Sequence, residues 1–334
     1  NYYMRHTTNL LTLKSFDNPV AGINNYWSNG GSMDNNGFEV TLTAKPVVSK
    51  DFNIEVGASV GHYTNKIKSL PNDDKIYLNG KKDAVGYTSS IYGTDNIATI
   101  VGQAAGSFYG YKTAGVFADD KEAAAAGKEG YLYLTDNTGA KQYFRAGDMH
   151  FVDINGDGEI SEADKTIIGN PNPDIYGNIF ASIMWKNFTL SLGFNYSLGN
   201  DVFNYSRSIL EGGNNFYNQT TAMTNRWRQE GQQTDIPRIS FDDAMGNSRF
   251  SDRWIEDGSY LRLKTLNLSY KVPVNSEWLQ GLTIWAEASN LFTLTHYLGS
   301  DPEFSASNSV LYQGIDPGNI ALSRAFTFGL KINL

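Results

Sequence analysis

The chain has 334 residues, a formal net charge of −8 and no cysteine. The negative charge argues against nucleic acid as a partner, because phosphates need clustered Lys and Arg. The lack of cysteine excludes disulfides and cysteine–metal sites. No run of eighteen or more apolar residues occurs, which excludes a transmembrane helix. An aromatic content of 13%, with 20 Tyr and 33 Gly, is rich for a soluble enzyme and normal for strands that cross membrane interfaces.

The first third of the chain contains three predicted strands. An irregular strand is predicted over residues 1–13, followed by a loop rich in Asn, Gly and Ser over 18–37. Apolar and polar residues then alternate from Phe38 and again from Phe52, and a short turn joins the two segments. A period of two places successive side chains on opposite sides of a strand, so each segment has one apolar and one polar face.

Five more predicted strands follow, and they begin near Ile179, Phe188, Tyr260, Leu282 and Ala325. The first two form a hairpin whose turn is only Lys186-Asn187. The apolar residues of the strand over 260–271 change phase partway along it, which predicts a β-bulge near Lys264. The closing strand, 325–334, alternates without a break and ends with Leu334.

The connections between these strands are alternately short and long. The long ones are an excursion over residues 65–173, a second over 199–259 and a third loop over about 295–324. Repeated alternating segments of about ten residues, with tight turns on one side and long loops on the other, are typical of outer-membrane barrels. Structureless loops beyond about 12–15 residues are uncommon, so we expect the excursions to be folded. The pattern predicts an all-β protein, an arc of about eight antiparallel strands from a larger transmembrane barrel, with the long loops outside the cell. We expect the chain to be the carboxyl-terminal part of a longer protein.

The clearest chemical motif lies in the first excursion and resembles a twelve-residue calcium loop. Its predicted ligands are Asp153, Asn155, Asp157, Glu159 (through its carbonyl), Ser161 (through water) and Asp164. Gly158 occupies the sixth position, where the chain turns sharply. The last ligand is Asp rather than the usual Glu, and the preceding residues 149–152 do not read as a helix. We expect a structural calcium ion, with magnesium as the alternative, and an acidic solvated turn is the competing interpretation.

No other pattern indicates catalysis. The four histidines are scattered, and no nucleophile elbow or phosphate-binding loop occurs. The acidic pairs Asp119-Asp120 and Asp242-Asp243 are of a kind that surface loops carry routinely. The aromatic and amide residues over 200–218 are suited to stacking on a sugar and equally to loop packing.

Several short motifs occur in order over nearly the whole chain. They are Gly106-Ser-Phe-Tyr-Gly-Tyr111, Gly115-Val-Phe117, Gly147-Asp148, Ile168-Gly-Asn-Pro-Asn-Pro173, Asn225-Arg-Trp227, Thr234-Asp-Ile-Pro-Arg238, Trp254-Ile-Glu-Asp-Gly-Ser-Tyr-Leu-Arg-Leu-Lys264, Ser289-Asn-Leu-Phe-Thr293, Asp301-Pro302 and Phe326-Thr-Phe-Gly-Leu330. With these motifs the chain resembles the carboxyl-terminal region of SusC/RagA-type TonB-dependent outer-membrane transporters of Bacteroidetes-like bacteria. Leu334 departs from the family, whose members more often end in an aromatic residue.

The resemblance implies a 22-stranded barrel in the outer membrane of a Gram-negative bacterium, with the plug and earlier strands upstream of this chain. It also implies a SusD-like surface lipoprotein as partner and TonB as the source of energy. We therefore expect import of a bulky nutrient, a glycan oligomer ahead of an oligopeptide. The alternatives are a passive porin or a calcium-binding surface adhesin, and a soluble β-rich enzyme is a more distant third.

Overall fold

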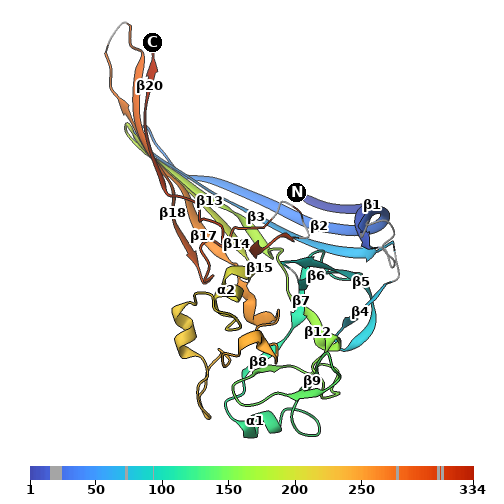
Figure 1. Ribbon diagram of the computed structural model, residues 1–334. Helices are drawn as coiled ribbons and strands as arrows, with labels where there is room; N and C mark the ends of the chain where they lie inside the picture. Colours follow the sequence, from blue (N-terminus) through green and yellow to red (C-terminus); the bar gives the residue numbers. More distant parts are fainter. Residues whose placement is uncertain (16–24, 72–73, 93, 276–277, 307–308, 310–311) are drawn as a thin grey trace.

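A computed structural model describes the chain except for residues 16–24, 72–73, 93, 276–277, 307–308 and 310–311. It consists of one long curved sheet and a body of folded connections at one end of that sheet (Figure 1). Within the described residues, no helix is both long and apolar enough to cross a membrane.

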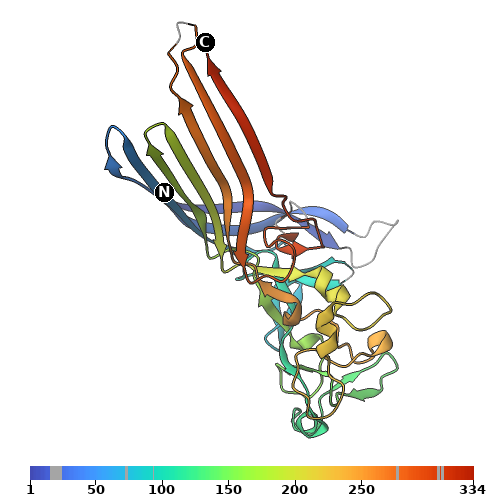
Figure 2. The same ribbon diagram turned by 90° about the vertical axis from the view of Figure 1, so that its left-hand side faces the viewer.

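The long sheet has eight antiparallel strands in sequence order, and it is open, with the first and last strands at its edges. The strands are β1 (Tyr2–Ser15), β2 (Asn25–Val48), β3 (Phe52–Ser69), β13 (Ile175–Trp185), β14 (Phe188–Leu198), β17 (Tyr260–Val272), β18 (Gly281–Thr295) and β20 (Ala325–Asn333). These are the eight strands that the sequence predicts. Figure 2 shows the short turns together at one end of the sheet and the long connections at the other.

The pairing register gives the sheet two chemically different faces. One transverse row across seven strands is entirely apolar: Ala44, Val56, Ala181, Leu192, Leu266, Ala288 and Phe326. The adjacent row, on the opposite face, is entirely polar: Glu55, Ser182, Ser191, Asn267, Glu287 and Thr327. The apolar face is not covered by the rest of the described chain, since Phe326, Phe328, Leu330 and Ile332 are all more than half exposed. A sheet that exposes its apolar face needs an apolar surrounding.

Two details of the sheet confirm local predictions. Between β14 and β17 the pairing passes from Gly193 with Thr265 to Phe194 with Leu263, so Lys264 is the extra residue of a bulge. In the hairpin of β13 and β14, Trp185 pairs with Phe188 across a two-residue turn. Lys186 in that turn adopts a positive φ of 53°, as the tight turns of hairpins require.

The predicted loop over residues 18–37 is wrong from residue 25 onward. β2 begins at Asn25 and pairs with β1 through residues such as Asn35 and Asp34, opposite Arg5 and His6. His6 Nδ1 lies 2.6 Å from Asp34 Oδ1. Asn, Gly and Ser predominate in this part of β2 and its few apolar residues do not alternate, so backbone pairing makes a strand that the side-chain pattern does not indicate. Residues 18–24 lie outside the described part of the chain.

The body of folded connections, called the loop body below, is built from three segments: residues 70–174, 199–259 and 296–324. The first contains a five-stranded sheet in the order β12 (Lys165–Gly169), β7 (Ser107–Tyr111), β6 (Thr94–Ile100), β5 (Lys81–Ile91) and β4 (Lys75–Leu78). The first excursion therefore has far more strand than the sequence pattern indicates.

Shorter elements complete the loop body. They are β8 (Thr113–Val116), α1 (Asp120–Ala124), β9 (Tyr133–Thr135), β10 (Lys141–Tyr143), β11 (Met149–Phe151), η1 (Glu162–Asp164), β15 (Asp201–Asn204), α2 (Tyr205–Leu210), η2 (Thr221–Asn225), η3 (Phe241–Asp243), η4 (Asp252–Trp254), β16 (Ile255–Asp257) and β19 (Ile315–Asp316). The buried apolar clusters of the molecule lie here. The largest centres on Phe117, Leu132, Phe144, Met149 and Phe151, and a second centres on Phe108, Phe203 and Trp254.

Candidate ligand and ion sites of the loop body

A buried arginine on the polar face of β17 connects the sheet to the third connecting segment. The Arg262 side chain is only 2% exposed. Its guanidinium donates to carboxylates of Asp301 and Glu303, the latter at 2.7 Å, and to Thr293 Oγ1 on β18 at 3.0 Å. Segment 296–324 is therefore held against the polar face by charge-assisted hydrogen bonds.

A second buried carboxylate connects the first and second excursions. Asp148 is fully buried and accepts from Arg238 Nε at 2.8 Å and Nη2 at 3.0 Å, a bidentate geometry. It also accepts from Asn247 Nδ2 at 2.9 Å. Beside it the Trp227 ring packs against Gly147, where an added Cβ would lie 2.4 Å from the ring. The two excursions are thus packed as one body.

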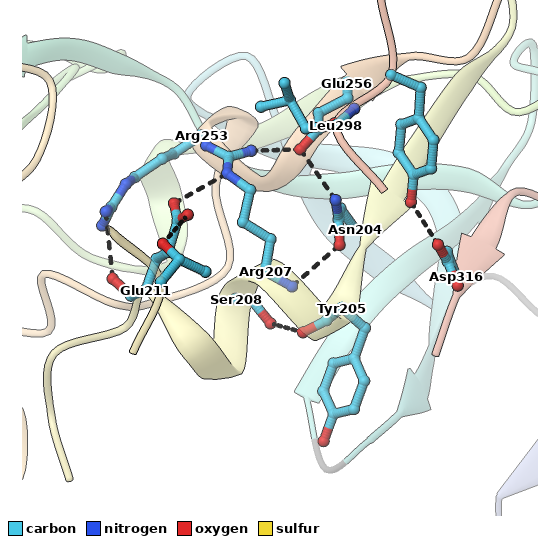
Figure 3. A network of polar contacts seen from close by, with 11 residues as sticks. Asn204, Tyr205, Arg207, Ser208, Glu211, Arg253, Glu256, Leu298 and Asp316 are labelled. Carbon is cyan, nitrogen blue, oxygen red and sulfur yellow. Dashed lines mark hydrogen bonds and ion pairs between the residues drawn. The ribbon is translucent and has the colours of Figure 1, made fainter. Parts of the chain in front are cut away.

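A third network surrounds Arg207 on α2 (Figure 3). Its Nε lies 3.1 Å from Glu211 Oε2 and its Nη1 lies 2.6 Å from Glu256 Oε1. Glu256 on β16 also accepts from Asn204 Nδ2 at 3.2 Å and from the backbone N–H of Leu298 at 2.9 Å. Glu211 additionally accepts from Thr220 Oγ1 at 2.7 Å. The network joins the second excursion to the third connecting segment.

The network forms one wall of a pocket with a volume of about 830 Å³. Thr113 and Met149 of the first excursion line it, as do residues 222–236 of the second and Leu298 of the third segment. The pocket lies where all three segments meet. Its size is that of a site for a small organic ligand.

The predicted calcium loop is held by hydrogen bonds from its own backbone. Asp153 Oδ1 accepts from Gly156 N and Oδ2 from Gly158 N, both at 2.7 Å. Asn155 Oδ1 accepts from Asp157 N at 3.0 Å. Gly156 and Gly158 have positive φ values of 74° and 87°, which favour glycine. The loop therefore bends around the Asp153 carboxylate, while Asn155 and Asp157 remain exposed.

The remaining predicted ligands lie at the end of this loop. Asp157 Oδ1 accepts from Glu159 N at 2.8 Å, and Ser161 Oγ accepts from Ala163 N at 3.2 Å. Asp164 is fully buried and accepts from the backbone of Ile154 and of Ser161, both at 2.9 Å. Burial raises the pKa of Asp164, and these N–H donors oppose the rise.

The predicted ligands of the calcium loop all bind through oxygen, which is the ligand type that hard cations such as Ca²⁺ and Mg²⁺ prefer. Within the described residues, no group of three or more His, Cys, Asp or Glu side chains is arranged to hold a metal ion. Residues 149–151 before the loop form a strand, as expected, rather than an EF-hand helix.

Other singled-out residues have structural contacts. Asp119 caps α1 by accepting from Glu122 N at 2.8 Å, and Asp243 accepts from Asn247 N at 2.7 Å. Of the aromatic residues over 200–218, Phe203 is buried, whereas Phe216 is 91% exposed. Tyr205 stacks on Tyr92 with ring centroids 3.9 Å apart.

Sequence reasoning missed the Arg207 network. Arg207 and Glu211 have the i,i+4 spacing of a helical ion pair, but Glu256, which joins them to the third segment, lies 49 positions from Arg207 and 42 from Leu298. The resemblance motifs did contain Glu256, Arg262, Asp148, Arg238 and Asp301, although they gave no partner for any of them.

Comparison with known proteins tests the resemblance. No family model matches the chain. It is 31% identical over 343 residues to TonB-dependent receptor P3 of Formosa agariphila, with 99% of this chain and 32% of the relative covered. TonB-dependent receptor SusC of Bacteroides thetaiotaomicron is 28% identical over 345 residues, with 99% and 29% covered. The resemblance to SusC/RagA-type TonB-dependent receptors is thereby confirmed.

Solved structures agree with the fold of a SusC/RagA-type chain. The RagAB peptide transporter superposes with a TM-score of 0.71 at 23% identity, over 99% of this chain and 32% of that one. The RagAB peptide importer in its closed-closed state gives 0.72 at 24% identity, over 99% and 33%. The eight-stranded sheet is accordingly part of a transmembrane barrel. The chain spans about a third of the length of the relatives it matches.

Proposed function

We propose that the protein containing this chain imports a bulky nutrient across the outer membrane of a Gram-negative bacterium. The observation that carries the proposal is the combination of a two-faced sheet with identity to TonB-dependent receptors over 99% of the chain. The apolar rows suit contact with lipid and the polar rows suit a water-filled lumen. The folded segments at one end of the sheet provide a binding surface at the mouth of the barrel.

In this proposal the chain works with partners beyond itself. The open edges of β1 and β20 pair with the remaining strands of the same barrel, because unpaired backbone groups are costly in a bilayer. A SusD-like surface lipoprotein covers the outer mouth, and TonB supplies energy from the periplasm. The family of the relatives supports both partners.

A glycan oligomer is the favoured substrate and an oligopeptide is the alternative. Similarity to SusC does not indicate which substrate this chain takes. RagAB is a peptide transporter, but at 22–24% identity its similarity to this chain supports the shared fold and not a shared substrate. The exposed rings of Phe216 and Tyr217 suit stacking on sugar rings. The pocket of about 830 Å³ has both polar and apolar lining residues, which suits either kind of oligomer.

Uptake by cells that express the intact transporter and its lipoprotein tests the proposal. Labelled glycan oligomers and oligopeptides are supplied separately, with and without a protonophore and in the presence or absence of TonB. We expect accumulation of one class that stops without TonB or proton motive force. Uptake that persists under both conditions would indicate a passive porin. Surface binding without uptake would indicate an adhesin.

We also propose that the loop over residues 153–164 binds a structural calcium ion, or magnesium in its place. Asp153, Asn155 and Asp157 provide oxygen ligands on a loop that bends around the Asp153 carboxylate, and Asp164 closes it from a buried position. The ion would stabilise the first excursion and take no part in transport chemistry. Isothermal titration of the chelated protein with each cation tests this, and absence of binding to both would refute it.

A further inference from the structure

A smaller pocket of about 280 Å³, called the aromatic pocket below, lies beside α2. The rings of Tyr92, Tyr205 and Phe250 line it, and Tyr92 stacks on Tyr205. Figure 3 shows the Tyr205 ring pointing away from Glu211 and Glu256. Neither of these carboxylates lines the aromatic pocket, which is therefore distinct from the Arg207 network.

Two asparagines give the aromatic pocket hydrogen-bonding groups that are held in position. Asn215 Nδ2 donates to Asn214 Oδ1 at 2.8 Å, and Asn214 Nδ2 donates to Ser248 Oγ at 3.0 Å. Each amide nitrogen carries two N–H groups, so each keeps one for a ligand. Among the described residues, no hydrogen bond engages the phenol hydroxyl of Tyr92 or Tyr205. The pocket therefore offers both donors and acceptors, which the hydroxyl groups of a sugar require.

The charges around the aromatic pocket favour a neutral ligand. Arg249 is the only charged residue among those that line it. Its guanidinium donates to the carbonyls of Gly246 and Met245, both at 3.0 Å, and lies 4.7 Å from the ring centroid of Phe151. These contacts hold the charge against the core of the first excursion. No acidic residue lines the pocket, so an ammonium group of a ligand would lose its water without gaining an ion pair.

A peptide fits this lining less well than a glycan does. Extended peptides commonly bind by adding a strand to an open sheet edge. The strand that contributes to the lining is β15, through Phe203, and β15 is already paired on both sides, by β16 and by β19. The lining residues therefore offer no open strand edge. A sugar needs none, since its hydroxyl groups bond to side-chain amides and phenols singly.

Two exposed phenylalanine rings lie next to the aromatic pocket. Phe216 directly follows Asn215 and is 91% exposed, and Phe241 is 67% exposed. Their ring centroids are 5.0 Å apart. The backbone N–H of Asp242 donates to the Asn214 carbonyl at 3.3 Å and so joins the two segments. Exposed apolar rings are unfavourable in water, and the apolar C–H face of a sugar ring that stacks on Phe216 would cover them.

We propose that the aromatic pocket and the pair of Phe216 and Phe241 form a binding subsite for a neutral glycan. One sugar unit enters the pocket and hydrogen-bonds to the free amide N–H groups and the phenol hydroxyls. A neighbouring unit stacks on Phe216. The inference rests on the proposed import function for the role of the site, and it deepens that function because it names a neutral glycan as cargo and the residues that hold it.

Equilibrium binding to the intact transporter in detergent tests the site. The neutral probes are maltohexaose, cellohexaose, xylohexaose and mannohexaose; hexagalacturonate is the acidic comparison, and an acetylated and amidated hexapeptide of alanine and serine is the peptide comparison. We expect at least one neutral hexasaccharide to bind, and to bind more tightly than either comparison. Phe216→Ala should weaken that binding about three- to tenfold, as for the loss of one stacked ring. Tyr205→Phe, which removes only a hydroxyl, should weaken it about twofold or more. Tyr143→Ala, which removes an exposed ring on β10 outside the site, should leave it unchanged.

Failure of all four neutral hexasaccharides to bind would overturn the proposal, and so would binding that Phe216→Ala leaves unchanged. Tighter binding of the hexapeptide or of hexagalacturonate would also overturn it, because the site would then take another class of ligand. Phe216 is almost fully exposed, so its replacement should not disturb folding, and heat-modifiable migration checks this. Binding in detergent needs no TonB. Loss of energised uptake with glycan binding intact would therefore refute import and leave the site standing.

Discussion

Replacing Leu330 by Arg tests whether the apolar face of the sheet meets lipid. Leu330 lies in the central part of β20, pairs with Ile284 of β18 and is 65% exposed in the isolated chain. In water, a substitution at such an exposed position should change the free energy of unfolding by no more than about 0.5 kcal/mol. In a bilayer the charge must be placed in hydrocarbon, which costs about 2–4 kcal/mol near the midplane. The two environments therefore predict clearly different results for one substitution.

Thr327→Arg is the matched control, because Thr327 lies on the polar face and pairs with Glu287. An arginine there meets water and a carboxylate, so we expect a change below about 1 kcal/mol. The assay is denaturant unfolding of the intact transporter in lipid vesicles, with heat-modifiable migration of outer-membrane fractions as a second measure. Equal tolerance of the two arginines would refute the assignment of this face to lipid.

Three further measurements address the membrane topology of the chain and the loop body. On whole cells, an impermeant thiol reagent should label the cysteine of Asp136→Cys, in the first excursion, but not that of Lys186→Cys, because the short turns are predicted to be periplasmic. Labelling of Lys186→Cys but not of Asp136→Cys would show that the predicted topology is inverted. Asp153→Ala should weaken calcium binding and increase proteolysis of the first excursion, and chelation should do the same to the wild type but add nothing to the variant. Arg238→Met should destabilise the loop body by about 1–3 kcal/mol in thermal unfolding, since it removes the bidentate partner of the buried Asp148 carboxylate; an unchanged melting temperature would contradict this.

The strands of the barrel could be predicted from the sequence because their two faces meet different solvents. Alternation is strong wherever one face is apolar, as in β20, β14 and the central part of β3. Even the bulge at Lys264 was predictable, because an extra residue shifts the phase of the apolar positions. The same reasoning fails for residues 25–37, where Asn, Gly and Ser predominate and the few apolar residues do not alternate, so that pairing with β1 and, from Ser32, with β3 makes the strand.

The loop body could not be predicted in the same way, because its contacts are long-range. Asp148 and Arg238 are 90 positions apart, and Arg262 and Asp301 are 39 apart. Nothing in local spacing matches a given carboxylate to a given arginine. The calcium loop is the exception, since all its predicted ligands lie within twelve residues, and the structure shows the loop bent around the Asp153 carboxylate. Whether an ion binds there stays a prediction.

The long connections are folded because they bury cores of their own, and this bears on how the pocket would bind. Phe117, Leu132 and Phe144 are almost completely buried in one cluster, and Phe108 and Trp254 in another. The buried apolar surface offsets the entropy of ordering these long segments. Glu256 then fixes α2 to the third segment through Arg207 and Leu298 N. The walls of the pocket are thus ordered during folding rather than on binding, so little affinity is lost in arranging them around a ligand.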